Sequence, residues 1–210
     1  MTESAAQAYA ILRDPSYFQW YIIPLLVITL YVYFVEIGDQ NWNVLFAGLA
    51  LWGMDWINEI INSLIFHFTG YAPLWAAPGD TAYLILIGLN IEISLMFLIM
   101  GVATARVLPA DKKMKILGIP NRAFLAVTFA ITAVIVEIVL NAWGALTWDY
   151  SWWSARNPIL IFFFGYLTFF IVSYWVYDMP TVKQKATTVG VIYGIVIVSL
   201  ILFGAVLGWI

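Results

Sequence analysis

Residues 52–63 read Trp52-Gly53-Met54-Asp55-Trp56-Ile57-Asn58-Glu59-Ile60-Ile61-Asn62-Ser63. They place two carboxylic acids and two amides inside a stretch that otherwise has the apolar character of a membrane-spanning helix. At about 100° per residue, these four polar side chains fall within an arc of roughly 100° and form one stripe on a helix. An ionisable group near the centre of a bilayer costs about 2.5–3.5 kcal/mol, so such groups usually face a bundle interior and have a function.

The composition is that of an integral membrane protein. Of the 210 residues, 64% are hydrophobic and 10% are charged, and the mean hydropathy is +0.93. Charged residues make up about 25% of an ordinary soluble domain. Several apolar runs reach the ~20 residues that a helix needs to cross a bilayer. The sequence therefore predicts an all-α, polytopic helical membrane bundle that forms a single domain over residues 1–210.

Six membrane-spanning helices are expected, at residues 20–37, 44–68, 82–107, 123–146, 159–178 and 187–210. Asp80-Thr81, Asn121 and Asn157-Pro158 supply start signals for the third, fourth and fifth. Pro24 is expected to kink the first span or to lie in its opening turn. Residues 1–19 lack the basic segment of a signal peptide and are expected to contain a short interfacial helix that ends before Pro15.

Positive charge predicts the orientation in the cell membrane. Seven of the nine basic residues lie in or beside the connections between spans three and four and between spans five and six: Arg106, Lys112, Lys113, Lys115, Arg122, Lys183 and Lys185. The positive-inside rule makes these two connections cytoplasmic, so both chain termini are expected outside. The outer side then carries two aromatic connections, residues 69–80 and 147–158, which form either an aromatic belt at the headgroups or a lid over a cavity.

Further polar residues interrupt the third and fourth spans. The third carries Asn90, Glu92 and Ser94, and the fourth carries Glu137 and Asn141. Asp55 and Asn90 are expected near mid-membrane, and Glu59, Asn62, Glu137 and Asn141 toward the outer leaflet, all sharing one cavity. Glu92 lies about 200° around the helix from Asn90, so it is expected to face elsewhere, toward a neighbouring subunit or the Gly88 side.

No Lys or Arg lies within the apolar core of any span, so the membrane acids have no cation to pair with. A buried carboxyl group without a counter-charge favours its neutral form, and some of these acids should be protonated at neutral pH. Such an acid can donate a proton, relay protons, or release one on binding a cation. Glu59, Asp55 and Glu137 are therefore the candidate catalytic residues.

The candidate substrate-binding residues are the neighbouring amides and indoles: Asn58, Asn62, Asn90, Asn141, Trp52, Trp56 and Trp143. Indole faces stabilise positive charge. The alternative for each amide is a hydrogen bond between helices, worth ~0.6 kcal/mol on average. Cysteine is absent and His67 is the only histidine, which excludes thiolate catalysis, Cys-bound or His-clustered zinc and iron–sulfur sites. No cofactor and no metal are expected.

The acid-bearing pieces resemble the small integral-membrane terpene cyclases of meroterpenoid pathways. In that family a polar residue four positions before a glutamate on the second span recurs near a leucine–asparagine pair on the third, here Asp55, Glu59 and Leu89-Asn90. The resemblance covers two helices and implies Glu59 as the donor of a proton to an epoxide or alkene, with Asp55 and Asn90 supporting it. That family has about seven spans and a second acid on the last one, whereas the last span here has none; Glu137 is the candidate replacement.

Three functions remain open at this point. The first is an enzyme that acts on an isoprenoid or other lipidic substrate by general acid catalysis. The second is a proton- or cation-coupled transporter, which predicts broken helices at mid-membrane. The third is a non-catalytic subunit of a larger membrane complex, with Glu92 as the contact. The expected partners are membrane lipids, a hydrophobic small molecule and either a second copy of the chain or a membrane-complex partner; no nucleic acid is expected.

Overall fold

The computed structural model describes residues 1–210 and is mostly helical. Its helices are α1 (Glu3–Ile11), α2 (Ile22–Gly38), α3 (Trp42–Thr69), α4 (Ile91–Arg106), α5 (Asn121–Ala142), α6 (Thr168–Tyr177) and α7 (Val182–Ser199). A 3-10 turn, η1 (Pro15–Tyr17), precedes α2, while two π-helical segments, η2 (Ile161–Leu167) and η3 (Leu200–Val206), are continuous with α6 and α7. Two antiparallel hairpins pair β1 (Leu84–Leu86) with β2 (Leu89–Asn90), and β3 (Lys115–Ile116) with β4 (Ile119–Pro120).

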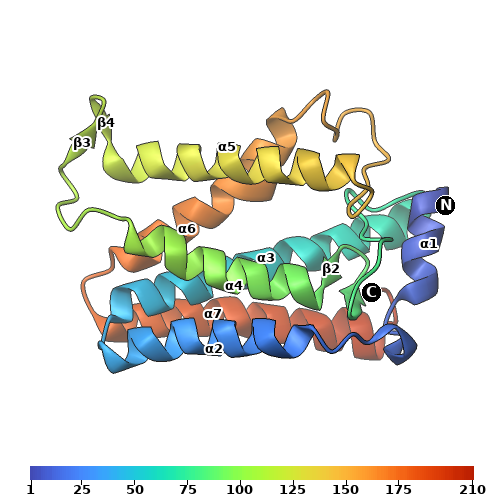
Figure 1. Cartoon of the computed structure of the whole chain (residues 1–210), viewed down its shortest axis with the longest axis horizontal. Coiled ribbons are helices and arrows are strands. Elements are labelled where there is room, and N and C mark those ends of the chain that lie inside the picture. Colours follow the sequence, from blue (N-terminus) through green and yellow to red (C-terminus); the bar gives the residue numbers. More distant parts are fainter.

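Helix α3 forms the centre of the bundle. It packs against α4, α6 and α7, while α2 lies against α4, and α5 packs on η2 and α6. In Figure 1 the β3–β4 hairpin and the α6–α7 connection lie at one end of the molecule, and both chain termini lie at the other. The two connections that carry most of the basic residues, α4–α5 and α6–α7, therefore lie at the same end of the bundle, as the charge pattern predicts.

Three helices are long and apolar enough to cross a membrane by length and composition: Trp42–Thr69, Asn121–Ala142 and Val182–Val206. Two shorter apolar helices are Ile22–Gly38 and Ile161–Tyr177. Large apolar side chains on their outer faces are exposed, including Tyr31 and Phe34 on α2 and Val198 on α7. Such a continuous apolar exterior suits contact with lipid. Pro24 lies in the opening turn of α2, one of the two places expected for it.

The expected third span, residues 82–107, is only partly helical, and this prediction is corrected. Its first part forms the β1–β2 hairpin, and the helix begins at Ile91 with Asn90 as its N-cap. The Asn90 side chain accepts a hydrogen bond from the backbone N–H of Ile93 at 2.8 Å. Asp80-Thr81 is therefore no helix start, and Asn90 lies at the start of α4 rather than within a helix.

Ion pairs lie at the end of the bundle that holds the β3–β4 hairpin. Glu36 is fully buried at the end of α2 and accepts a hydrogen bond from Arg106 at the end of α4. Asp178 pairs with Arg122 at 2.9 Å and with Lys112 at 3.5 Å. Buried Lys185 donates to the carbonyls of Val176 and Tyr177 at the end of α6. These contacts fix the helix ends. They also bind these basic residues to groups that lie far from the acids of α3.

The N-terminal segment docks on the opposite end. Helix α1 ends at Ile11, before Pro15 as expected, and its Ala5 and Ala8 are fully buried. Ala8 packs on Ala76, Ala77, Leu84 and Ile87. The hydroxyls of Thr2 and Ser4 donate to the Asp149 carboxylate at 2.9 and 2.6 Å. Helix α1 therefore joins the two aromatic connections to the β1–β2 hairpin.

Candidate functional site

The two aromatic connections pair with each other and fold inward. Ala76 and Thr147 exchange antiparallel backbone hydrogen bonds at 3.1 and 2.8 Å. The rings of Trp75 and Trp153 are stacked with their centroids 5.8 Å apart, and Trp153 is buried. Trp75 and Trp153 also line a cavity, as the lid arrangement predicts.

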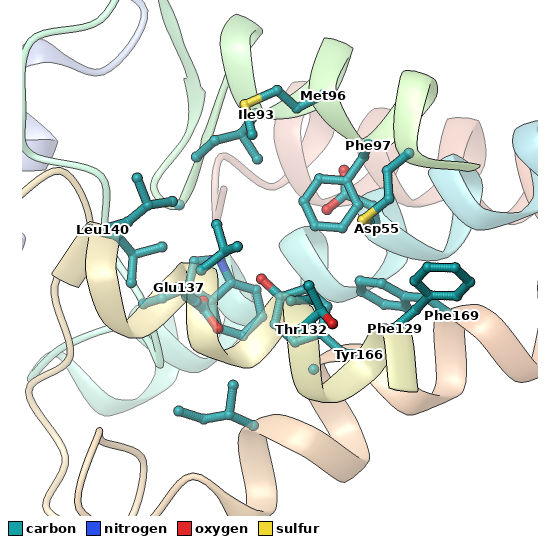
Figure 2. Close-up of a pocket in the computed structure, with 18 of the residues that line it drawn as sticks. Asp55, Ile93, Met96, Phe97, Phe129, Thr132, Glu137, Leu140, Tyr166 and Phe169 are labelled. Carbon is teal, nitrogen blue, oxygen red and sulfur yellow. The ribbon is translucent and has the colours of Figure 1, made fainter. Parts of the chain in front are cut away.

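Below this lid lies a cavity of about 300 Å³ between α3, α4, α5 and the η2–α6 helix. It is lined by 22 residues, 15 of them hydrophobic. Figure 2 shows Ile93, Met96 and Phe97 of α4 across the cavity from Thr132, Glu137 and Leu140 of α5. Trp75 and Trp153 of the lid, together with Leu146, complete the wall. A largely apolar cavity with a few convergent polar groups is the usual form of a small-molecule site.

All three acids proposed from the sequence line this one cavity. Asp55 and Glu59 come from successive turns of α3, and Glu137 comes from α5. Their exposed fractions are 2%, 2% and 7%, and each has one buried carboxyl oxygen without a hydrogen-bond partner in the protein. No Lys or Arg lines the cavity. Unpartnered buried oxygens are costly, and here they mark the part of the cavity where chemistry can occur.

Glu59 is the acid whose position is most fully determined. Its Oε1 accepts a hydrogen bond from the indole Nε1 of Trp75 at 2.7 Å, while Oε2 has no partner. Gly88 permits this contact, because a Cβ at residue 88 would lie 2.5 Å from the Trp75 ring. One oxygen of Glu59 is thus held by a neutral donor, and the other has no partner within the protein.

Asn62, which is fully buried, holds the lid over Glu59. Its Oδ1 accepts from the backbone N–H groups of Leu74 and Trp75 at 2.7 and 3.3 Å, and its Nδ2 donates to the Trp75 carbonyl at 2.7 Å. The side chain does not line the cavity. Asn62 therefore positions Trp75 and does not itself contact a bound molecule.

We expect Asn62→Leu to lower the free energy of unfolding by about 2 kcal/mol, because it leaves three backbone groups of the lid without partners. Residues 74 and 75 should also exchange their amide hydrogens faster. Thermal unfolding in detergent and hydrogen exchange measure both effects. Asn58→Leu is the matched control, since half-buried Asn58 makes a single bond to the Phe164 carbonyl; equal losses from the two variants would contradict this role for Asn62.

Tyr166 is a cavity residue that sequence reasoning missed. It lies in the π-helical segment η2, and its hydroxyl faces the Glu137 carboxyl. π-Helical turns are rare and occur frequently at functional sites. The preceding Gly165 also lines the cavity, but apolar sequence alone does not reveal a π-helix. Trp75 and Trp153 were missed for a different reason, since they could equally have faced the headgroups.

The remaining residues proposed from the sequence lie outside the cavity lining. Trp52 donates to the Ser94 hydroxyl at 2.8 Å and packs edge-on against Trp56. Asn141 donates to the Leu146 carbonyl beyond the end of α5. Trp143 is 77% exposed on the exterior. Glu92, whose role was open, accepts from Tyr21, from Thr81 at 2.8 Å and from the Ala82 N–H at 2.6 Å.

The arrangement suits proton transfer to and from an apolar molecule. Three carboxyl groups and a phenol can donate or accept protons, and the aromatic faces of Trp75, Trp153 and Phe97 can stabilise a developing positive charge. No group of three or more His, Cys, Asp or Glu side chains is arranged to hold a metal ion.

Comparison with known proteins gives a family and no activity. A family model described as "Uncharacterized membrane protein family" matches residues 2–205. The chain is similar to two Archaeoglobus fulgidus proteins described as uncharacterized. One is 56% identical over 209 residues, which is 100% of this chain and 99% of the relative, and the other is 49% identical over 53 residues, 25% and 95%. No solved structure matches the chain. Because the family match extends over almost all of the sequence, the chain belongs to this uncharacterized membrane protein family.

Proposed function

We propose that the protein is an integral membrane enzyme that protonates an apolar substrate in the cavity between α3, α4, α5 and η2–α6. The observation that carries the proposal is the convergence of Asp55, Glu59 and Glu137 on one apolar cavity that no basic residue lines. Uncompensated acids inside a membrane are costly to keep, and they usually mark a functional site such as a proton relay or a substrate pathway. Without a cation, at least one of the three is neutral and able to act as an acid at neutral pH.

The proposal includes six membrane crossings: α2, α3, α4, α5, η2–α6 and α7–η3. The basic end that contains the β3–β4 hairpin faces the cytoplasm, and both termini lie outside. In this orientation the lid covers the outer end of the cavity. The acids then lie nearer the outer leaflet than the cytoplasmic ion pairs, as the positions of Glu59 and Glu137 along their helices require.

Glu59 is the proton donor in this proposal. Its Oε2–H gives the proton to an alkene carbon or an epoxide oxygen, and the Glu59 carboxylate that forms keeps the hydrogen bond from Trp75. The resulting carbocation lies against aromatic faces of the cavity. Glu137 or Asp55, as the carboxylate, then removes a proton from a neighbouring carbon, and the new C=C bond forms from those electrons. Substrate and product are isomers, so the reaction needs no oxidant, reductant or cofactor.

The substrate class proposed is an isoprenoid or a related lipid with an alkene or epoxide. The resemblance of Asp55, Glu59 and Leu89-Asn90 to the membrane terpene cyclases supports it. Two details of that resemblance change: Asn90 caps α4, and Trp75 and Asn62 take the supporting places beside Glu59. Glu137 on α5 supplies the second acid that the family carries on its last span.

The other two functions receive less support. A relay or transporter needs a path through the bundle, but α3 is unbroken over its 28 residues. A packed apolar cluster, two of whose members also line the cavity, would have to open for such a path: Phe169, Phe170, Leu51, Leu108, Ala126, Ala130 and Tyr174. A complex subunit was expected to use Glu92 as its contact, and Glu92 has three partners within its own chain.

The proposal is tested by incubating the purified protein in vesicles with a membrane lipid extract of its source, in H2O and in D2O. We expect a product of unchanged mass in H2O. In D2O an alkene substrate gains a carbon-bound deuterium, because carboxyl protons exchange with solvent before they are transferred, whereas an epoxide substrate takes the deuterium into an exchangeable hydroxyl and is recognised by its changed retention. Mass spectrometry and chromatographic retention detect such a product. A lipid profile that is the same with and without the protein, and free of deuterium, would overturn the proposal.

A further inference from the structure

The cavity has an opening on its side, between α4 and α5. These two helices do not pack closely on each other, because α4 lies against α2 and α3, whereas α5 lies against η2 and α6. Three cavity-lining residues at this position are exposed: Met96 on α4, 50% exposed, and Thr132 and Val136 on α5, the latter 46% exposed. Side chains that line the interior and are also half-exposed mark a passage from one to the other.

The other sides of the cavity are closed. The lid residues Trp75 and Trp153 cover its outer end, and α3 forms its floor. At the basic end, the packed apolar cluster around Phe169 and Phe170 fills the bundle. The α4–α5 opening lies on the apolar exterior of the bundle, beside the exposed Ile131, Ile135 and Val139. In a membrane this opening faces lipid and not water.

The passage is apolar at its rim and polar at its inner end. Its rim is apolar, since the Thr132 hydroxyl donates to the Thr128 carbonyl at 2.9 Å and presents its methyl group and not a free donor. The carboxyl groups of Asp55, Glu59 and Glu137 lie deeper and are almost fully buried. A molecule that satisfies both regions has its reactive, weakly polar end inside and its apolar chain at the rim.

We propose that the ligand is a single-chain membrane lipid that enters sideways from the bilayer between α4 and α5. Its reactive head reaches Glu59 and Glu137, while its tail stays between the two helices and extends into the surrounding lipid. This inference rests on the proposed function for the fate of the head group, but binding by this route is a separate property. Entry by this route means that the α4–α5 rim selects substrates that are already dissolved in the membrane.

The test is photolabelling in phosphatidylcholine vesicles with hexadecanol that carries a diazirine near its hydroxyl end. We expect crosslinks to cavity residues such as Glu59 and Tyr166, located by mass spectrometry. The double variant Thr132→Trp/Val136→Trp fills the rim and should lower this interior labelling by about tenfold or more. Because both positions face the exterior, the larger rings should not prevent folding.

The matched control is Ile131→Trp/Ile135→Trp, which places the same rings on exposed positions of α5 that do not line the cavity. It should leave interior labelling unchanged. The lateral route would be overturned if the rim variant labelled the interior as strongly as the unchanged protein does. It would also be overturned if a short, water-soluble butanol that carries a diazirine labelled the interior as strongly as the hexadecanol probe. Labelling does not need proton transfer, so crosslinks to Tyr166 should form whether or not a product is made. Rim-dependent labelling without any product would therefore reject the proposed reaction and retain the route.

Discussion

Glu59→Gln is expected to lower the rate of product formation by about 10²–10⁴-fold, the usual contribution of a positioned general acid. Glutamine has the size of a protonated glutamate, and its carbonyl oxygen can still accept the hydrogen bond from Trp75 that Glu59 Oε1 accepts at 2.7 Å. It has no acidic proton to release from the other position. The rate is measured as isomerised product formed by the protein in vesicles, which carries deuterium after reaction in D2O where an alkene carbon is protonated.

Glu3→Gln is the control, because Glu3 is an exposed acid on α1 and the chemical change is the same. Glu3→Gln should keep the full rate. The free energy of unfolding of Glu59→Gln should stay within about 1 kcal/mol of that of the unchanged protein, since the proposed mechanism has Glu59 protonated and glutamine is also neutral. Full activity of Glu59→Gln in a folded protein would remove Glu59 from the mechanism. Equal losses in Glu59→Gln and Glu137→Gln are compatible with it, because each carboxyl group handles a proton in the same cycle.

The polar stripe on α3 was predictable because it depends only on helix geometry. Once residues 52–63 are helical, Asp55 and Glu59 must share a face one turn apart. Glu137 was predictable from local sequence as well, because it is an acid on another apolar helix that has no cation nearby. The structure confirms that the chain is mostly helical and that these three acids line one cavity. The six crossings and the orientation stay predictions.

The rest of the site depends on contacts between distant parts of the chain. Residues 82–90 form an apolar run that periodicity cannot distinguish from a helix. Only the pairing of β1 with β2 shows that part of this run is a hairpin. Trp75 and Trp153 reach the cavity because Ala76 pairs with Thr147, which no local pattern encodes. Trp143, in contrast, was predicted to line the cavity and does not. It lies just after the end of α5, where the chain turns and leaves the ring exposed.

Gly101→Leu is expected to lower the free energy of unfolding by about 3 kcal/mol or more, because α3 and α4 cross there in backbone contact. A Cβ at residue 101 would lie 2.7 Å from the carbonyl oxygen of Gly48 and 2.8 Å from its Cα. Backbone atoms of a helix cannot rotate aside as a side chain can. The two helices must therefore move apart, and unfolding measured in detergent as a function of temperature or denaturant reports the loss.

Gly190→Leu on α7 is the matched control, because nothing lies within 4 Å of the Cβ that it adds. Leucine is the better helix former by up to about 1 kcal/mol, so this variant should be as stable as the unchanged protein or slightly more so. Separation of α3 from α4 would also move Asp55 away from Met100, widening the cavity between them. Gly101→Leu should therefore lose product formation even in the fraction that stays folded, whereas Gly190→Leu should not. Equal stability of the two variants would mean that α3 and α4 do not touch at Gly48 and Gly101, and the cavity wall would then have a different origin.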